Sequence, residues 1–253
     1  MRIALFLDVD KTLTTHFIQQ ECAEMLGCKP EYDALEARFQ KEPDYTTTFG
    51  DEIVKIFASK GFTEKRAREF AKQVHLQPWT AQLLELPGVD KYLVSSGPSF
   101  FVNYLAKKFN IPKEHVCCST YTFHEETGII ESCQAVGRHD KQMLVDKHRD
   151  NYDLTIGVGD SPEHDGLFLS MCTIQLMTVP AREYIHISDL NSVILLVQRL
   201  SQALVDLDLE QGPLLPKLRA LTFAAWAAVI GTVIGFLAVG LAIGVELGKR
   251  GAH

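Results

Sequence analysis

The chain lacks the cysteine patterns of a disulfide scaffold or a zinc site. Its six cysteines show no C-x-x-C spacing, and none stands with histidines at metal-ligand spacing. We therefore expect reduced, half-buried thiols at the scattered positions Cys22, Cys28, Cys117, Cys118, Cys133 and Cys172.

An excess of positive charge is also missing. The sequence has 25 Lys and Arg against 32 Asp and Glu, for a formal net charge of -7 at pH 7. Proteins that bind nucleic acid neutralise its phosphates with Lys and Arg, so no nucleic-acid partner is expected. A phosphorylated ligand would need local cations or a metal ion to hold it.

Internal repeats and low-complexity tracts are absent as well, and no secretory signal is expected. The apolar run that follows Arg2 is interrupted at Asp8, too early for the hydrophobic region of a signal peptide. We therefore expect the folded part of the chain to lie in the cytoplasm.

Two carboxylates, Asp8 and Asp10, directly follow the strand-like residues 3–7, and Thr12 comes next but one. The carboxyl end of a strand is where open α/β sheets bind their ligands. Side chains two apart share a face of a strand, but rotation at the strand end lets both approach one phosphorus atom from different angles. One could attack while the other transfers protons.

The remaining sequence alternates between strand and helix patterns. Alternation of this kind predicts an α/β fold with a doubly wound parallel sheet, and 253 residues suit one catalytic domain with a modest insertion. The predicted strands cover residues 92–94, 116–123, 154–158 and 173–177, and helices are predicted around 100–109 and 140–148.

One long helical stretch interrupts this alternation. Residues 15–86 show repeated apolar spacing with Gly and Pro punctuation, which predicts a small helical cap inserted after the first strand. The cap would divide the catalytic core into residues 1–14 and 87–205.

The C-terminal part predicts a tether. Residues 206–219 are expected to form a linker, and 220–245 contain no ionisable residue. As a helix of about 26 residues the latter reach about 39 Å, enough to span a hydrocarbon layer of roughly 30 Å; a buried core helix is the alternative. Two small-x-x-x-small spacings, Gly231 with Gly235 and Gly240 with Gly244, leave a homodimer through this helix open.

Four separated pieces of the chain fit one chemical task. Besides the first two aspartates, Ser95 and Ser96 follow the strand at 92–94, Lys141 begins a helix, and Gly159-Asp160 opens a segment that ends at Asp165. Strand ends converge on one crevice in a doubly wound sheet. Each piece alone also has an ordinary explanation as a turn, a solvated helix start or a helix cap.

In this order, D-x-D-x-T, a Ser after a strand, a Lys and G-D-x-x-x-x-D resemble the haloacid dehalogenase-like (HAD) superfamily over roughly Arg2 to Leu200. The helical insertion and residues 104–112 are most similar to the phosphoserine phosphatase-like branch. The resemblance implies a HAD-like Rossmannoid core with an inserted helical cap, and a phosphatase.

Carried over by position, the resemblance implies that Asp8 is a nucleophile that forms an aspartyl phosphate and that Asp10 is the acid and base. Ser95, Ser96 and Lys141 would hold the phosphoryl oxygens, with Asp165 and Thr12 in support. Mg²⁺ would be bound by three oxygen donors, from Asp8, the Asp10 main-chain carbonyl and Asp160.

Substrate recognition is where the resemblance is weakest. Members that hydrolyse phosphoserine use an acidic residue and an Arg, and the best-matching positions are Phe17 and Ile56. Without the Arg, a substrate carboxylate would be left unpaired at a cost of about 1–3 kcal/mol. We therefore favour a small-molecule or lipid-like phosphate monoester beside an apolar wall of Phe17, Phe49 and Ile56, with phosphoserine as the alternative.

Three further alternatives differ in chemistry. A non-catalytic, membrane-anchored binding protein could use the same fold, and a phosphotransferase would share the first half-reaction. A dehalogenase of this superfamily lacks the second aspartate, so Asp10 argues against that activity.

Overall fold

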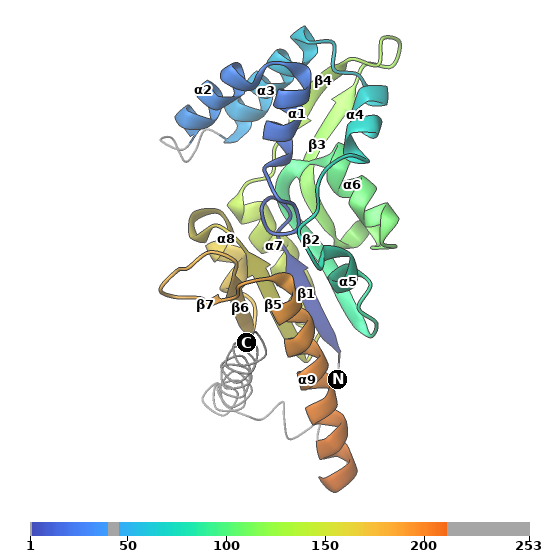
Figure 1. The fold of residues 1–253 in the computed structure, drawn as a ribbon, viewed down its shortest axis with the longest axis vertical. Helices are drawn as coiled ribbons and strands as arrows, with labels where there is room; N and C mark the ends of the chain where they lie inside the picture. The colour runs from blue at the N-terminus through green and yellow to red at the C-terminus, as the bar shows by residue number, and fades with distance from the viewer. Residues whose placement is uncertain (1, 40–45, 212–253) are drawn as a thin grey trace, which may run out of the picture. The chain divides into compact units, whose positions relative to one another are not determined.

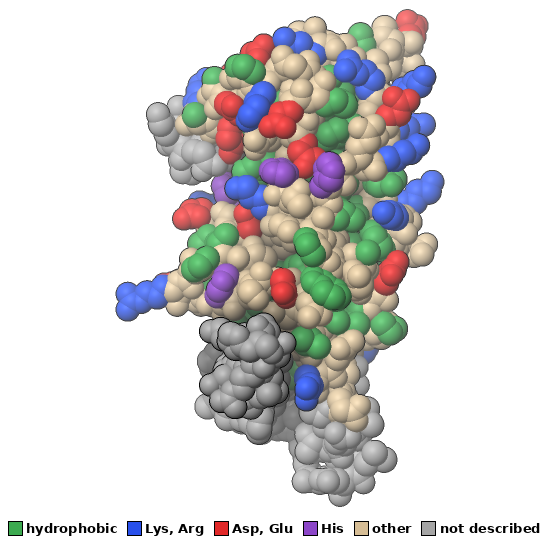
Figure 2. Space-filling model, viewed as in Figure 1, with side chains coloured by type: hydrophobic (Ala, Val, Ile, Leu, Met, Phe, Trp, Pro, Cys, Tyr) green, Lys and Arg blue, Asp and Glu red, His purple; other side chains and the backbone are tan. Residues whose placement is uncertain are grey.

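The computed structural model describes residues 2–39 and 46–211. The chain forms two units, Arg2–Ser192 and a second that begins at Val193. Every motif residue named above lies in the first unit, whose sheet and helices are drawn in Figure 1 and whose surface side chains are coloured by type in Figure 2.

A seven-stranded sheet organises this unit, with the order β4-β3-β2-β1-β5-β6-β7. All five residues of the central strand are buried, as expected for a strand with neighbours on both edges and helices over both faces. The strands are β1 (Ile3–Leu7), β2 (Val89–Pro98), β3 (Val116–Phe123), β4 (Ile130–Gln134), β5 (Leu154–Gly159), β6 (Ile174–Met177) and β7 (Ile185–His186).

The α/β prediction is confirmed, but the expectation of a wholly parallel sheet is wrong. β4 runs antiparallel to β3, whereas the other pairs are parallel. A short turn joins these two strands, in which His124 N donates to Ile129 O at 2.8 Å and Gly128 has a positive φ of 66°. A turn of this length can connect only antiparallel strands, so the sheet is mixed.

Among the described residues, five helices lie between β1 and β2. Four further helical segments lie between β2 and β6. The first group is α1 (Ile18–Leu26), α2 (Lys29–Phe39), α3 (Thr46–Ser59), α4 (Glu64–Ala71) and α5 (Thr80–Leu84), called the helical insertion below. The second is α6 (Ser99–Lys108), the 3₁₀ turn η1 (Lys113–His115), α7 (Arg138–Arg149) and α8 (Pro162–Leu169). The division into core and cap at residues 14/15 and 86/87 stays a prediction.

The β3–β4 hairpin extends alongside the helical insertion (Figure 1). Ile130 N donates to Phe62 O at 2.9 Å, and Glu64 N donates to Gly128 O at 2.8 Å. The Phe62 ring lies edge-on to Phe100 of α6, with ring centroids 5.4 Å apart. The hairpin therefore supports the insertion, although the two are far apart in the sequence. No pattern in the sequence predicts this contact.

The two chain segments that connect the insertion to the sheet run side by side. Thr15 N donates to His75 O at 3.0 Å, and Gln77 N donates to Leu13 O at 2.8 Å. These bonds lie within a few residues of Asp10, so the insertion is rooted next to the first motif.

The last described helix, α9, runs from Leu190 to Gln211. It includes residues 206–211, so this part of the expected linker is helical. Within residues 2–39 and 46–211, no helix is long and apolar enough to cross a membrane. The expected membrane helix at 220–245 lies outside the described residues.

Phe62 offers a test of this packing, because its side chain is fully buried and touches the rings of Phe57, Phe100 and Phe123. Phe62→Ala should lower the free energy of unfolding by about 3–5 kcal/mol, as expected for a buried aromatic ring replaced by a cavity. Urea unfolding would measure the loss, and Phe62→Leu should cost less. A loss in Phe62→Ala below about 1 kcal/mol would contradict the described packing.

Candidate active site

The parallel register brings three motif segments to one edge of the sheet. Leu7 at the end of β1 is aligned with Leu93 of β2 and with Val158 of β5. Asp8 N continues the ladder by donating to Val158 O at 2.9 Å. Asp8 and Asp160, which follow β1 and β5, therefore meet at the carboxyl edge of the sheet. The expectation that Ser95 and Ser96 follow their strand is wrong, because β2 continues through both residues to Pro98.

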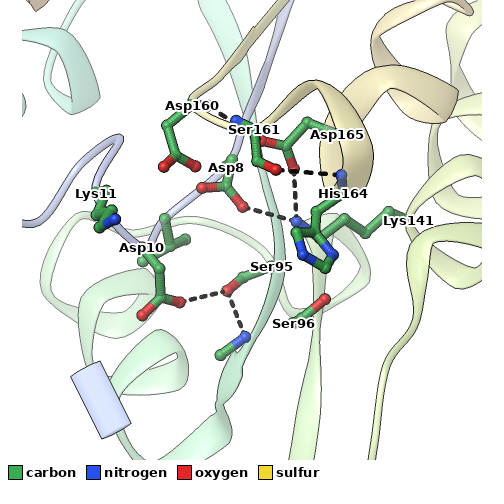
Figure 3. Close-up of polar contacts among 12 residues, drawn as sticks. Asp8, Asp10, Lys11, Ser95, Ser96, Lys141, Asp160, Ser161, His164 and Asp165 are labelled. Atoms are coloured by element: carbon green, nitrogen blue, oxygen red, sulfur yellow. Dashed lines mark hydrogen bonds and ion pairs between the residues drawn. The ribbon is translucent and has the colours of Figure 1, made fainter. Parts of the chain in front are cut away.

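Lys141 joins two of these segments. Its Nζ lies 2.8 Å from Asp8 Oδ1 and 2.8 Å from Asp165 Oδ1 (Figure 3). Lys141 and Asp8 are 3% exposed and Asp165 is 1% exposed. Burial alone lowers the pKa of Lys141, but the carboxylates of Asp165 and Asp8 more than offset it, and the pKa is raised. The ammonium therefore stays charged at neutral pH.

Asp165 also shapes the loop that carries Asp160. Its Oδ2 accepts hydrogen bonds from the main-chain N–H groups of Asp160 and Ser161, both at 3.1 Å. The loop passes so close that a Cβ on Gly159 would lie 2.5 Å from Asp165 Oδ2. Asp165 thus positions both the lysine and the loop, and its supporting role in catalysis stays a prediction.

Asp10 is held by two different parts of the chain. Its Oδ1 accepts a hydrogen bond from Ile18 N at 2.8 Å, at the start of α1. Its Oδ2 accepts one from Ser95 Oγ at 3.3 Å, and Ser95 Oγ in turn accepts one from Gly97 N at 2.8 Å. The first helix of the insertion and the end of β2 therefore fix one carboxyl group.

Burial of several carboxyl groups in one place raises their pKa values. Burial first, and the charge of Asp165 second, raise the pKa of Asp8 well above its ordinary value and that of Asp160 to about 7. Burial raises the pKa of Asp10 to about 6, although the Ile18 N–H bond opposes it. The cluster thus favours a cation or bound protons.

The donor set fits Mg²⁺. Carboxylate oxygens of Asp8, Asp160 and Asp165 lie within 4.8 Å of one another. Lys141 and two main-chain N–H groups already engage Asp165, whereas the carboxylates of Asp8 and Asp160 face each other in Figure 3. An all-oxygen set of carboxylates is the chemistry that Mg²⁺ prefers.

The other expected site residues are placed as follows. Thr12 is fully buried, and its Oγ1 has no hydrogen-bond partner within the described chain. Ser96 is exposed next to the buried Ser95. Phe17 precedes α1 and contacts the side chain of Lys11, whereas Phe49 is buried in α3 beside Tyr32, and Ile56 is half-buried on α3. The apolar wall of three residues stays a prediction.

Sequence reasoning missed two residues that shape this site. A Cβ on Gly97 would lie 2.3 Å from Asp10 Oδ2 and 2.9 Å from Ser95 Oγ, so only glycine fits there. A glycine two residues after the motif serine was the available signal. Lys11, which lies between Asp10 and Thr12, was not assigned a role, although its charge lowers the pKa of Asp160.

Comparison with known proteins gives one family and several structures of similar fold. The family model described as haloacid dehalogenase-like hydrolase matches residues 5–167. A HAD family hydrolase from Salmonella enterica serovar Typhi is 18% identical, with a TM-score of 0.61 over 73% of this chain and 66% of that chain. No curated protein matches the sequence.

Two further structures are similar at low identity. A substrate-bound phosphoserine phosphatase is 14% identical, with a TM-score of 0.59 over 77% of this chain and 97% of that chain. A protein of unknown function from Bordetella pertussis Tohama I is 16% identical, with a TM-score of 0.57 over 70% of this chain and 90% of that chain. At these identities the likeness shows the fold alone.

Gly97→Ala tests how tightly Asp10 and Ser95 are placed. The new methyl group must displace one of them, and a shift of about 1 Å at a reacting group can cost about a hundredfold in rate. We expect the mutant to fold and to lose about that much activity on a generic aryl phosphate. Gly137→Ala is the matched control, because its Cβ would meet only Asp140 Oδ2 at an ordinary 3.7 Å. Equal activity of the two variants would contradict the site geometry.

The raised pKa values predict how pH and Mg²⁺ affect stability. A carboxyl group with a raised pKa in the folded state stabilises the fold below its ordinary pKa, and this contribution is lost as pH rises toward the folded value. For Asp10 and Asp160 the loss should occur between about pH 4 and the folded values of about 6 and about 7. Mg²⁺ should restore stability at the upper end, where its ligands are ionised.

Thermal unfolding at pH 5.0 and 7.5, with and without MgCl₂, would measure this effect. We expect a larger Mg²⁺-dependent rise in Tm at the higher pH. Asp160→Asn serves as the reference protein, because subtracting its change in Tm removes the contribution of the other titrating groups. This variant should also lose most of the rise in Tm that Mg²⁺ causes. The same Mg²⁺ effect at both pH values, or in both proteins, would rule out this account.

Proposed function

The chain belongs to the haloacid dehalogenase-like hydrolase family, and on that premise we propose that it is a Mg²⁺-dependent phosphomonoester hydrolase that acts through an aspartyl phosphate on Asp8. Phosphoserine phosphatases among the structures of similar fold support a phosphatase. The observation that carries the proposal is the buried contact of Lys141 with Asp8, beside an Asp10 that hydrogen bonds hold in place.

Asp8 is the attacking group in this proposal. Lys141 engages Oδ1, which orients the carboxylate and leaves Oδ2 for attack on phosphorus. The bond from Asp8 to phosphorus forms while the bond from phosphorus to the leaving oxygen breaks. Lys141 and Ser95 then lie close enough to the reacting carboxylates to hold the phosphoryl oxygens, whose negative charge the ammonium offsets.

Asp10 moves the proton in both halves of the reaction. In the first half it donates a proton to the leaving oxygen, and in the second it takes a proton from the water that attacks phosphorus and releases Asp8. A pKa of about 6 is close to what such an exchange needs near neutral pH. The Ile18 N–H and Ser95 Oγ keep the carboxyl group in one orientation.

Asp8 and Asp160 would hold Mg²⁺, together with the main-chain carbonyl of Asp10. When bound, the ion supplies positive charge beside the phosphoryl oxygens and favours the ionised form of Asp8. Asp165 keeps Asp160 in place through the loop N–H groups, and Thr12 lies buried two residues after Asp10.

The substrate is a small-molecule or lipid-like phosphate monoester, and phosphoserine remains the alternative. We also propose that residues 220–245 tether the enzyme to a membrane with the catalytic unit on the cytoplasmic side. The uncharged length of that segment supports the tether, and its glycine spacing leaves homodimer formation through it open.

Two substitutions test the mechanism on p-nitrophenyl phosphate with MgCl₂. Asp8→Asn should remove turnover, because an amide cannot form the aspartyl phosphate. Asp10→Asn should lower kcat by about 10²–10⁴, the usual contribution of a general acid and base. Asp146→Asn is a matched control on the exposed face of α7, and we expect wild-type activity from it.

Mass spectrometry after acid quenching should show the added phosphoryl group on the Asp8 peptide of Asp10→Asn, where breakdown is slow. A folded Asp8→Asn protein with wild-type turnover would contradict the mechanism. A wild-type protein without any Mg²⁺-dependent turnover would favour the binding-protein alternative.

A further inference from the structure

Lys11 has an unusual backbone conformation for a residue with a side chain. Its φ is 59°, in the left-handed region that favours glycine. Lys11 N donates a hydrogen bond to Thr14 Oγ1 at 3.1 Å, which closes the turn after Asp10. Strained conformations of this kind gather at functional sites, so the side chain that the turn presents merits a functional explanation.

The Lys11 ammonium has no oppositely charged partner within the described residues. Its Nζ lies 4.1 Å from the centre of the Phe17 ring, and the residue is exposed. Within the described chain, no carboxylate lies at ion-pair distance from this Nζ and no acceptor binds it. Asp160 is near enough for the charge of Lys11 to lower its pKa, yet the ammonium is held on an aromatic face. Its three N–H donors are thus available to a ligand.

The location of Lys11 relates it to the leaving group. Phe17 directly precedes Ile18, whose N–H donates to Asp10 Oδ1 at 2.8 Å. Figure 3 draws Lys11 beside Asp10 and Asp160, while Lys141 approaches Asp8 from the other side. Under the proposed function, Asp10 protonates the leaving oxygen. Lys141 therefore serves the transferred phosphoryl group, and Lys11 lies near the group that departs.

We propose that Lys11, supported by the face of Phe17, binds an anionic group on the leaving part of the substrate, a carboxylate or a second phosphate. The inference rests on the proposed function and specifies its substrate class. It also changes the expected role of Phe17, because the ring then supports the Lys11 ammonium and does not form part of an apolar wall against the substrate. Phosphate esters of uncharged alcohols are then the poorer substrates.

Three substrates of equal chain length test the inference: propyl phosphate, 3-(phosphonooxy)propanoate and propane-1,3-diyl bisphosphate. The full-length wild-type protein with MgCl₂ should show a higher kcat/KM for at least one of the two anionic compounds, and the one preferred identifies the source of the charge. In Lys11→Gln the ratio of kcat/KM between that compound and propyl phosphate should fall about tenfold, the value of one charge-assisted contact, mainly through KM.

Two variants serve as controls. Lys11→Arg keeps the charge and should keep most of the preference. Lys107→Gln removes an exposed lysine of α6 that makes no ion pair within the described residues. This variant should leave the ratio unchanged. Lys11→Gly removes the side chain and suits the left-handed backbone, so it should fold and show the same lost preference as Lys11→Gln.

An unchanged ratio in folded Lys11→Gln and Lys11→Gly, or an equal fall in Lys107→Gln, would overturn the inference. A wild-type protein that prefers propyl phosphate would do the same.

Binding to Asp8→Asn with MgCl₂ separates this inference from the proposed function. Calorimetry should show that the preferred anionic compound and propyl phosphate differ in Kd. Adding Lys11→Gln to Asp8→Asn should remove this difference. If hydrolysis fails in the wild type but this binding difference depends on Lys11, the proposed function is wrong and the anion site stands. If hydrolysis occurs and neither ratio depends on Lys11, the function stands and the anion site is wrong.

Discussion

The buried contact between Lys141 and the carboxylates of Asp8 and Asp165 is the interaction on which the site depends. It joins the end of β1, the start of α7 and the start of α8, three segments far apart in the sequence. A buried charge that loses its partner is strongly destabilising, so these three residues keep their positions only together. Asp165 also fixes the position of Asp160, because its Oδ2 accepts hydrogen bonds from the main-chain N–H groups of Asp160 and Ser161.

The helical insertion holds one of the carboxyl groups of the candidate site. Its first N–H group holds Asp10, and its two connections to the sheet pair with each other within a few residues of that carboxyl group. The β3–β4 hairpin supports the same insertion through Phe62 and Gly128. Any movement of the insertion would therefore displace Asp10, the group that transfers the proton in the proposed mechanism.

Excess negative charge explains the need for cations at this edge of the sheet. Asp8, Asp10 and Asp160 all have raised pKa values because burial separates them from water. Lys141 balances part of this charge beside Asp8, and Asp8 and Asp160 would hold a Mg²⁺ ion that balances more. In our proposal Lys11, whose ammonium lies on the face of the Phe17 ring, places positive charge near the leaving group. Under these proposals, substrate choice and catalysis would depend on the same local balance of charge.

Local patterns in the sequence determined which strands form the sheet centre and which side chains follow them, because apolar runs must be buried and parallel strands end at one edge. The exposed, mixed sequence of β4 carried no such signal, and neither did the pairing of α1 with Asp10. Only the tertiary structure decided that Gly97 must lack a Cβ, that Lys141 reaches two carboxylates and that Lys11 rests on Phe17. These depend on distances between segments that are remote along the chain, and local propensity contains no information about such distances.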